Sequence, residues 1–201
     1  MMRRIGLVLV LGIMPMSAGA RDLSRFFSEV HTLKARFTQV VRDRHGALVS
    51  RGQGRLWLKR PGEFRWDYKT PYHEQIVGHG SGVWIYDPGL AQATRYSLNQ
   101  ALGRTPALLL AGRGHLSRLF IIQHLPHRQG LTWIKLKPRL HGQGFRWIRI
   151  GYKAVRIQRI VLRDTLDQTT TIDLRDSQLN QALPAALFRF QAPPHTAIVR
   201  E

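Results

Sequence analysis

Apolar and polar residues alternate along most of the chain. The clearest stretch is residues 63–69, where Phe64, Trp66 and Tyr68 share one face and charged residues take the other. Strict alternation is typical of a strand with one buried and one solvated face. The same period predicts further strands at residues 35–42, 55–59, 73–78, 82–87, 91–97, 119–125, 131–137, 145–152, 155–163 and 169–175. Turn residues separate most of them, as in antiparallel barrels and sandwiches.

Two segments break this rhythm and predict short helices. Asp22 is placed to cap one whose apolar stripe follows helical spacing, at Leu23, Phe26, Phe27 and Val30. The second covers residues 105–111, which begin with Thr-Pro and are followed by a glycine. Because this helix is apolar on all sides, it needs cover on nearly every side. We expect it either to plug a concave apolar sheet or to pack as ordinary core. Residues 115–120 are a candidate for one more helical turn.

The first twenty residues have the three parts of a secretory signal peptide. Two arginines precede a short apolar run, and Ala18-Gly19-Ala20 provides a cleavage site. The apolar run is shorter than the roughly 20 residues that a membrane-spanning helix needs, although an uncleaved anchor is the alternative. We therefore expect a signal peptide at residues 1–20 and a single exported domain at residues 21–201.

The chain is strongly basic, with 31 Lys and Arg against 12 Asp and Glu, a formal charge of +19. Such charge first suggests nucleic acid, but export from the cytoplasm argues against that partner. Residues 88–163 contain no Asp or Glu at all. Two hypotheses for the excess remain: a surface that docks acidic partners or anionic head groups, or adaptation to an acidic periplasm.

Signals for catalysis or metal binding are weak. No cysteine is present, which excludes disulfides, thiolate zinc sites, a cysteine nucleophile and the acylated cysteine of a lipoprotein. The glycine-rich residues 78–82 lack the lysine and helix of a phosphate loop and are better explained as a hairpin turn. Glu63 and Asp67 lie about 13 Å apart on an extended strand, too far for an acid–base pair. We therefore predict neither an enzyme nor a cofactor or metal.

Residues 52–66 are similar to a family signature. Their sequence, Gly-Gln-Gly-Arg-Leu-Trp-Leu-Lys-Arg-Pro-Gly-Glu-Phe-Arg-Trp, resembles that of the LolA family of periplasmic lipoprotein carriers. Further segments resemble landmarks of the same family in the same order, at residues 35–39, 80–92, 105–111, 136–138 and 188–194. The resemblance thus spans nearly all of the exported part.

The resemblance implies a fold and a function. The fold is mainly β with short helices: an incomplete, half-open antiparallel β-barrel with a lid of short helices over an apolar cavity. The protein would be a monomeric periplasmic chaperone that takes lipoproteins from an inner-membrane ABC complex and shields their acyl chains. It would deliver them to an outer-membrane acceptor, the lipoprotein LolB. The missing acylated cysteine excludes the acceptor role for this chain.

The resemblance also implies site residues. Arg60 would latch the lid by donating hydrogen bonds to carbonyl groups of the lid. Without the resemblance, Arg60 would be interpreted as a solvated charge beside a turn. The acyl-chain and lid positions, which otherwise read as core, are Phe27, Phe64, Trp66, Leu108, Leu110 and Ala111. Alternatives are a LolA-like carrier or sensor of another lipid, such as a glycolipid or pigment lipid, and a basic polyanion-binding protein.

Overall fold

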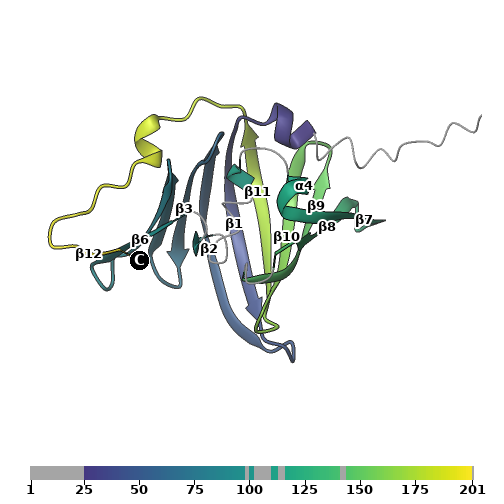
Figure 1. Ribbon diagram of the computed structural model, residues 1–201, viewed down its shortest axis with the longest axis horizontal. Coiled ribbons are helices and arrows are strands. Elements are labelled where there is room, and N and C mark those ends of the chain that lie inside the picture. Colours follow the sequence, from purple (N-terminus) through teal and green to yellow (C-terminus); the bar gives the residue numbers. More distant parts are fainter. Residues whose placement is uncertain (1–24, 98–99, 102–109, 113–115, 141–143, 201) are drawn as a thin grey trace, which may run out of the picture.

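The computed structural model describes residues 25–97, 100–101, 110–112, 116–140 and 144–200 (Figure 1). The predicted signal peptide lies outside these ranges. The described strands form one sheet in the order β12-β6-β5-β4-β3-β2-β1-β11-β10-β9-β8-β7. Their bounds are β1 Thr32–Arg42, β2 Leu48–Lys59, β3 Glu63–Thr70, β4 Glu74–His79, β5 Gly82–Asp87, β6 Gln92–Ser97, β7 Phe120–Arg128, β8 Leu131–Pro138, β9 Phe145–Lys153, β10 Arg156–Asp164, β11 Thr169–Leu179 and β12 Ala197–Arg200.

The sheet curls around one apolar interior and stays open, because its edge strands β12 and β7 do not pair with each other (Figure 1). Strand β1 shows how the sequence produces this arrangement. Leu33, Ala35 and Phe37 are buried on the inner face, whereas Lys34 and Arg36 are exposed on the outer face. Side chains from β2 at the centre of the sheet and from β9 near its edge share one buried cluster. The predicted open, mainly β architecture is confirmed.

Glycines opposite aromatic rings let the inner face pack tightly. Phe37 on β1 pairs with Gly54 on β2, and Phe64 on β3 pairs with Gly78 on β4. A Cβ atom on Gly54 would lie 1.9 Å from the backbone oxygen of Asp67 on β3 and 2.9 Å from Cε1 of Phe37, and one on Gly78 would overlap the Phe64 ring. The missing side chains therefore leave room at Gly54 for the backbone of β3 as well as the Phe37 ring, and at Gly78 for the Phe64 ring.

The helical segments are short. Residues 25–29 are helical, as the apolar stripe predicts, and α4 spans Leu116–Leu119, within the candidate turn at 115–120. Of the predicted helix at 105–111, only Leu110 and Ala111 lie in the described part, and both are helical. In these ranges no helix combines the length and apolarity needed to cross a membrane.

Two elements near the C-terminus were not predicted. The 3-10 helix η1 spans Ala185–Phe188 and buries Phe188. Strand β12 runs parallel to β6, an exception to the antiparallel pattern. All four residues of β12 are exposed, so the strand carries no alternating apolar signal that the sequence could reveal. The hydrogen bond from Ala197 N to Ala91 O, 2.8 Å long, helps to hold it.

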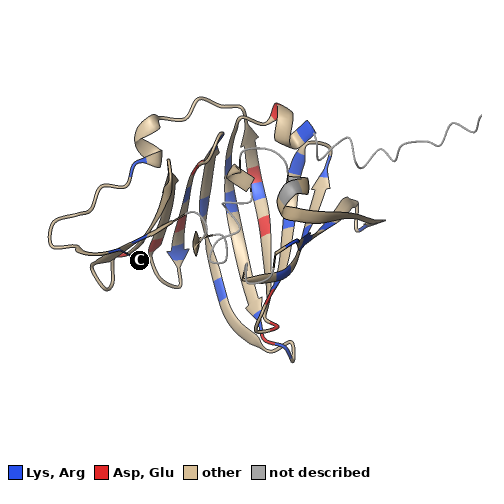
Figure 2. Ribbon diagram, viewed as in Figure 1, with Lys and Arg blue, Asp and Glu red and all other residues tan. Residues whose placement is uncertain are grey.

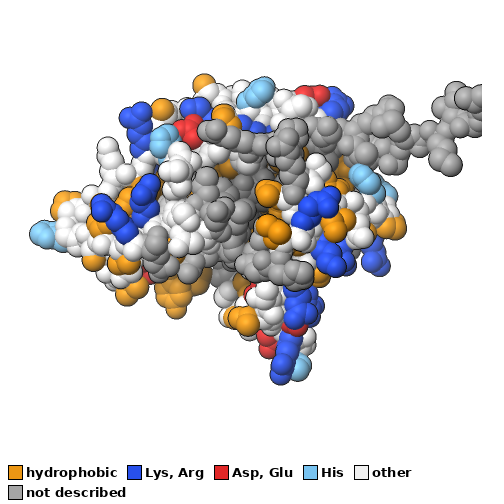
Figure 3. Space-filling model, in the orientation of Figure 1, with side chains coloured by type: hydrophobic (Ala, Val, Ile, Leu, Met, Phe, Trp, Pro, Cys, Tyr) orange, Lys and Arg blue, Asp and Glu red, His pale blue; other side chains and the backbone are white. Residues whose placement is uncertain are grey.

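The outer face of the sheet carries the excess positive charge. Figure 2 shows Lys and Arg spread along the strands, and Figure 3 shows them outnumbering Asp and Glu on the visible surface. Pairing places Arg36 of β1 directly opposite Arg55 of β2 and Arg175 of β11, which forms a row of three arginines. Like charges in such positions repel each other. Asp176 supplies a carboxylate to this row: its Oδ2 lies 3.6 Å from Nε of Arg36.

Substituting Gly78 tests whether the glycine–aromatic pairs set the shape of the inner face. Gly78→Ala should lower the free energy of unfolding by about 1–3 kcal/mol, because the Phe64 ring must leave its position. Gly89→Ala is the control, since the atom nearest to its Cβ is the movable Asp87 carboxylate. Equal stability of the two variants in urea denaturation would contradict the role of Gly78.

Candidate functional site

Arg60 lies at the turn between β2 and β3 and binds two segments that are far apart in the sequence. Its Nη1 donates hydrogen bonds to the carbonyl oxygens of Phe27 at 2.6 Å and Phe26 at 3.1 Å. Its Nε and Nη2 donate to the carbonyl oxygen of Leu110, at 3.3 and 3.1 Å. The planar guanidinium, with five donors in a fixed fork, is suited to such a junction.

Aromatic rings enclose the same guanidinium. Its Cζ lies 4.7 Å from the centre of the Phe26 ring and 4.5 Å from that of Phe27, within cation–π range. Burial lowers the pKa of Arg60 to about 10 because it penalises the charged form, yet the group stays protonated at neutral pH. The carbonyl oxygens and ring faces replace the water that this buried charge has lost.

Backbone hydrogen bonds extend the junction. The amide of Gly62 donates to the carbonyl oxygen of Ala111 at 2.8 Å, and the amide of Arg60 donates to that of His31 at 2.8 Å. The β2–β3 turn therefore holds both the N-terminal helical segment at residues 25–29 and the helical residues Leu110 and Ala111. We call these two segments the lid segments.

Asn180, beyond the end of β11, is a second clamp on the first lid segment. Its Oδ1 accepts from the amide of His31 at 2.8 Å, and its Nδ2 donates to the carbonyl oxygen of Glu29 at 2.9 Å. These bonds satisfy backbone groups that the end of a helix leaves unpaired. Asn180 has a positive φ of 57°, which asparagine tolerates better than most residues. Its position after a predicted strand gave no hint of this contact.

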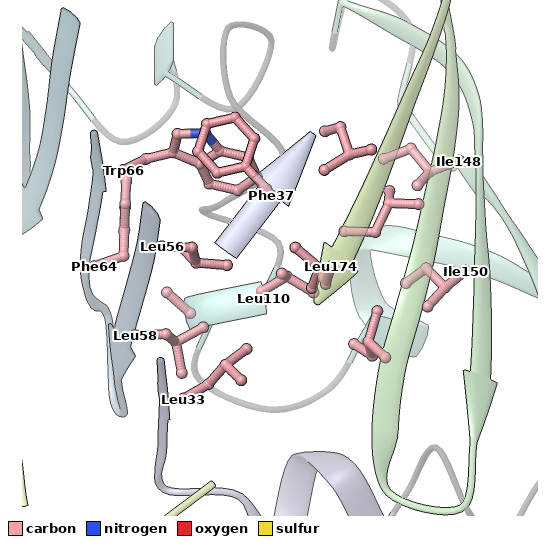
Figure 4. Close-up of a cluster of buried hydrophobic side chains, with 14 of the residues drawn as sticks. Leu33, Phe37, Leu56, Leu58, Phe64, Trp66, Leu110, Ile148, Ile150 and Leu174 are labelled. Atoms are coloured by element: carbon pink, nitrogen blue, oxygen red, sulfur yellow. The ribbon is translucent and has the colours of Figure 1, made fainter. Parts of the chain in front are cut away.

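The structure brings most of the candidate apolar residues together. Phe64, Trp66, Leu110 and Ala111 are all fully buried in one cluster, and Phe27 packs against it partly buried. Figure 4 shows Leu110 between a wall formed by Trp66, Phe64, Leu56 and Leu58 and a wall that carries Ile148 and Ile150. Leu108 lies outside the described residues.

Phe26 belongs to this site although the sequence singled out its neighbour Phe27. Phe26 is 1% exposed and contacts the Phe27 ring edge-on, with the ring centres 5.2 Å apart. Both residues belong to the apolar stripe of the helix, and the spacing alone does not reveal which ring faces the interior. Both rings lie within cation–π range of the Arg60 guanidinium.

Hollows open on the outer face of the sheet. One of about 480 Å³ is lined by four cations and one carboxylate, among other residues: Arg36, Arg55, Lys69, Arg175 and Asp176. Within the described ranges, no group of His, Asp or Glu could hold a metal ion. The described site thus combines apolar surface with the polar junction at Arg60.

The comparison with protein-family models decides the family. The model described as outer membrane lipoprotein carrier protein LolA matches residues 28–191, most of the chain. The chain belongs to the LolA family. An outer-membrane lipoprotein carrier protein from Methylococcus capsulatus is 40% identical over 171 residues, covering 85% of this chain and 82% of that relative. The one from Nitrosomonas europaea is 36% identical over 206 residues, covering both chains fully, at 100%.

Solved structures share the fold at low sequence identity. A LolA superfamily protein from Nitrosomonas europaea has a TM-score of 0.52 at 14% identity, covering 86% of this chain and 97% of that one. An uncharacterized conserved protein from Thermus thermophilus reaches 0.55 at 13% identity, covering 91% and 97%. At such identities these likenesses show the curved sheet of LolA-type proteins and nothing about ligands.

Asn180→Gly tests the second clamp. Glycine tolerates the positive φ, so the change removes the side-chain bonds without adding backbone strain. We expect the first lid segment to lose about 1–3 kcal/mol of protection. Hydrogen exchange at the amides of residues 26–31 measures this loss. Unchanged exchange there, or an equal increase across the whole sheet, would show that Asn180 does not hold the lid segment specifically.

Proposed function

We propose that this protein is a lipoprotein carrier that shields acyl chains against the inner face of its sheet. The observation that carries the proposal is the junction at Arg60, which bonds the backbone of two helical segments over a fully apolar wall. The family membership and the names of the curated relatives support the same function. Phe27, Phe64, Trp66, Leu108, Leu110 and Ala111 are the proposed lid and acyl-chain positions.

Physical chemistry explains why such a carrier needs a lid. Each CH₂ group that leaves a membrane for water costs about 0.8 kcal/mol, so acyl chains do not cross an aqueous space unaided. The carrier replaces water by its own apolar wall and must later release the chains. Opening then exchanges contacts of Leu110 and Ala111 with the sheet for contacts of the cargo with the sheet, a shift between two states.

The proposal includes the place of action and the partners. Residues 1–20 would direct export to the periplasm, where the chain from residue 21 acts as one monomeric domain. An inner-membrane ABC complex would supply the lipoprotein, and the outer-membrane lipoprotein LolB would accept it. The basic outer face supports encounter with acidic partner surfaces, since complementary charge speeds association.

Arg60→Leu tests the latch. Hydrogen bonds from a charged group contribute about 1.5–3 kcal/mol each, so losing even one shifts the balance of closed and open forms by about tenfold or more. The variant should still load lipoprotein but transfer it more slowly, because closure no longer helps to expel the cargo. Ser50→Leu, at an exposed and uncharged position of β2, should transfer normally. Normal transfer by Arg60→Leu in a reconstituted assay would contradict the role of Arg60 as a latch.

Cargo binding can be measured directly. The purified protein should bind an apolar fluorophore and release it when a lipoprotein is added, because both occupy the same surface. Mass spectrometry of lipids and proteins that co-purify from the periplasm identifies the natural cargo. Acylated proteins support the proposal, whereas a glycolipid or pigment lipid would favour a carrier of another lipid. A fluorophore that lipoprotein does not displace would indicate a permanently packed core.

A further inference from the structure

A row of arginines crosses the outer face at the centre of the sheet. Arg36 of β1 lies directly opposite Arg55 of β2 and Arg175 of β11. Paired strands lie about 5 Å apart, so the three side chains start from one line at about this spacing. Figure 2 shows basic positions on all three strands. Like charges in opposite positions destabilise a sheet, and folded proteins break such local rules mainly at functional sites.

The charge of this row is only weakly compensated. Oδ2 of Asp176 lies 3.6 Å from Nε of Arg36, which is longer than a hydrogen bond, and the Arg36 side chain is 71% exposed. Asp67 on β3 lies opposite Arg55, but both of its oxygens accept hydrogen bonds from Nε of Arg65, at 2.9 Å. The guanidinium at the centre of the row therefore faces solvent with donors to offer.

A bulge in β11 shapes the surface beside the row. Lys34 pairs with Gln178 and Arg36 pairs with Arg175, so that two residues of β11 face one residue of β1. Asp176, the first of the two, has a positive φ of 54°. Such a bulge re-aims side chains and is common beside functional sites. Arg175 and Asp176 consequently line one outer hollow, although consecutive residues of a regular strand face opposite sides.

The lining of this hollow, about 480 Å³ in volume, suits a small multivalent anion. Its cations come from the four neighbouring strands β3, β2, β1 and β11: Lys69, Arg55, Arg36 and Arg175. Thr38 and Gln53 add neutral hydrogen-bonding groups, and Asp176 is the one acidic residue of the lining. Guanidinium groups bind phosphate oxygens by pairs of parallel hydrogen bonds, whereas a lysine contributes a point charge.

We propose that the hollow binds a multivalent phosphate-type anion through Arg36, Arg55 and Arg175. Lys69 adds a fourth positive charge on the β3 side. The chemistry is the same for a free anion and for the phosphate of a lipid head group, and the test separates these sources. Because the hollow lies on the outer face, away from the junction at Arg60, the proposal does not depend on the carrier function.

Titration calorimetry with pyrophosphate tests the site. The wild type should bind one pyrophosphate per chain at low ionic strength, where salt does not screen exposed charges. Arg36→Gln removes the central charge of the row and keeps a polar side chain. Its affinity should fall about tenfold, the effect of losing one hydrogen bond to a charged group. A wild type that does not bind pyrophosphate would overturn the proposal.

Arg128→Gln is the charge-matched control. Arg128 is exposed at the end of the edge strand β7, so the substitution removes the same charge far from the hollow. It should bind pyrophosphate as the wild type does. Equal weakening by both substitutions would indicate diffuse attraction to a basic protein and overturn the proposal. Arg36→Gln should still bind an apolar fluorophore, so a loss of anion binding is distinct from a failure of the carrier function.

A measurement on the wild type needs no variant. In nuclear magnetic resonance spectra, the Nε–H signals of Arg36, Arg55 and Arg175 should shift when pyrophosphate is added. The signal of Arg128 should stay in place. Shifts of similar size for all four arginines would overturn the proposal.

Vesicles separate the two sources of the phosphate. If head groups supply it, the wild type should sediment with vesicles that contain phosphatidylglycerol but not with pure phosphatidylcholine, and pyrophosphate should release it. No sedimentation, with pyrophosphate binding retained, assigns the hollow to a soluble anion. A glutamate-rich peptide that occupies the hollow more tightly than pyrophosphate would assign this surface to an acidic protein and overturn the proposal.

Discussion

The hydrogen bonds from Arg60 to the backbone of the two lid segments are the constraint on which the proposed closed state depends. The guanidinium meets carbonyl oxygens of Phe26, Phe27 and Leu110 within 3.3 Å. Because the acceptors are backbone carbonyl groups, the junction fixes where the lid segments lie and does not depend on which side chains they carry. It can therefore close over a wall that any apolar ligand would also contact.

A carrier needs stability in the sheet and marginal stability in the lid, and the structure separates the two. The sheet is held by continuous strand pairing and by aromatic rings that fold over glycines, as Phe64 does over Gly78. The lid segments depend on a few polar clamps at Arg60, Gly62 and Asn180 together with apolar contacts. In the proposed function, acyl chains replace the apolar contacts, and the clamps then decide how readily the lid closes again.

Much of the fold could be predicted from the sequence, because a sheet with one solvated and one buried face requires polar and apolar residues to alternate along its strands. The strand at residues 82–87 was predicted with the bounds of β5, and the others agree closely at most ends. Strand β12 escaped prediction because its side chains are all exposed and its pairing is set by a backbone contact far along the chain. Such a strand has no periodic pattern to detect.

The site was predictable in part. Resemblance to a family pointed to Arg60, although nothing in local spacing distinguishes it from a solvated charge beside a turn. The clamp at Asn180 depends on contacts between segments far apart in the sequence, as between Asn180 and Glu29, 151 positions apart.

The central claim, that acyl cargo opens a lid latched by Arg60, can be tested by one distance measurement. The chain has no cysteine, so Ser28→Cys on the first lid segment and Gln53→Cys on β2 accept a unique pair of spin labels. Electron–electron double resonance should give one short distance without cargo and a longer one when a diacyl lipopeptide is bound. Adding Arg60→Leu should populate the longer distance without cargo. A distance distribution that neither lipopeptide nor Arg60→Leu changes would contradict the account.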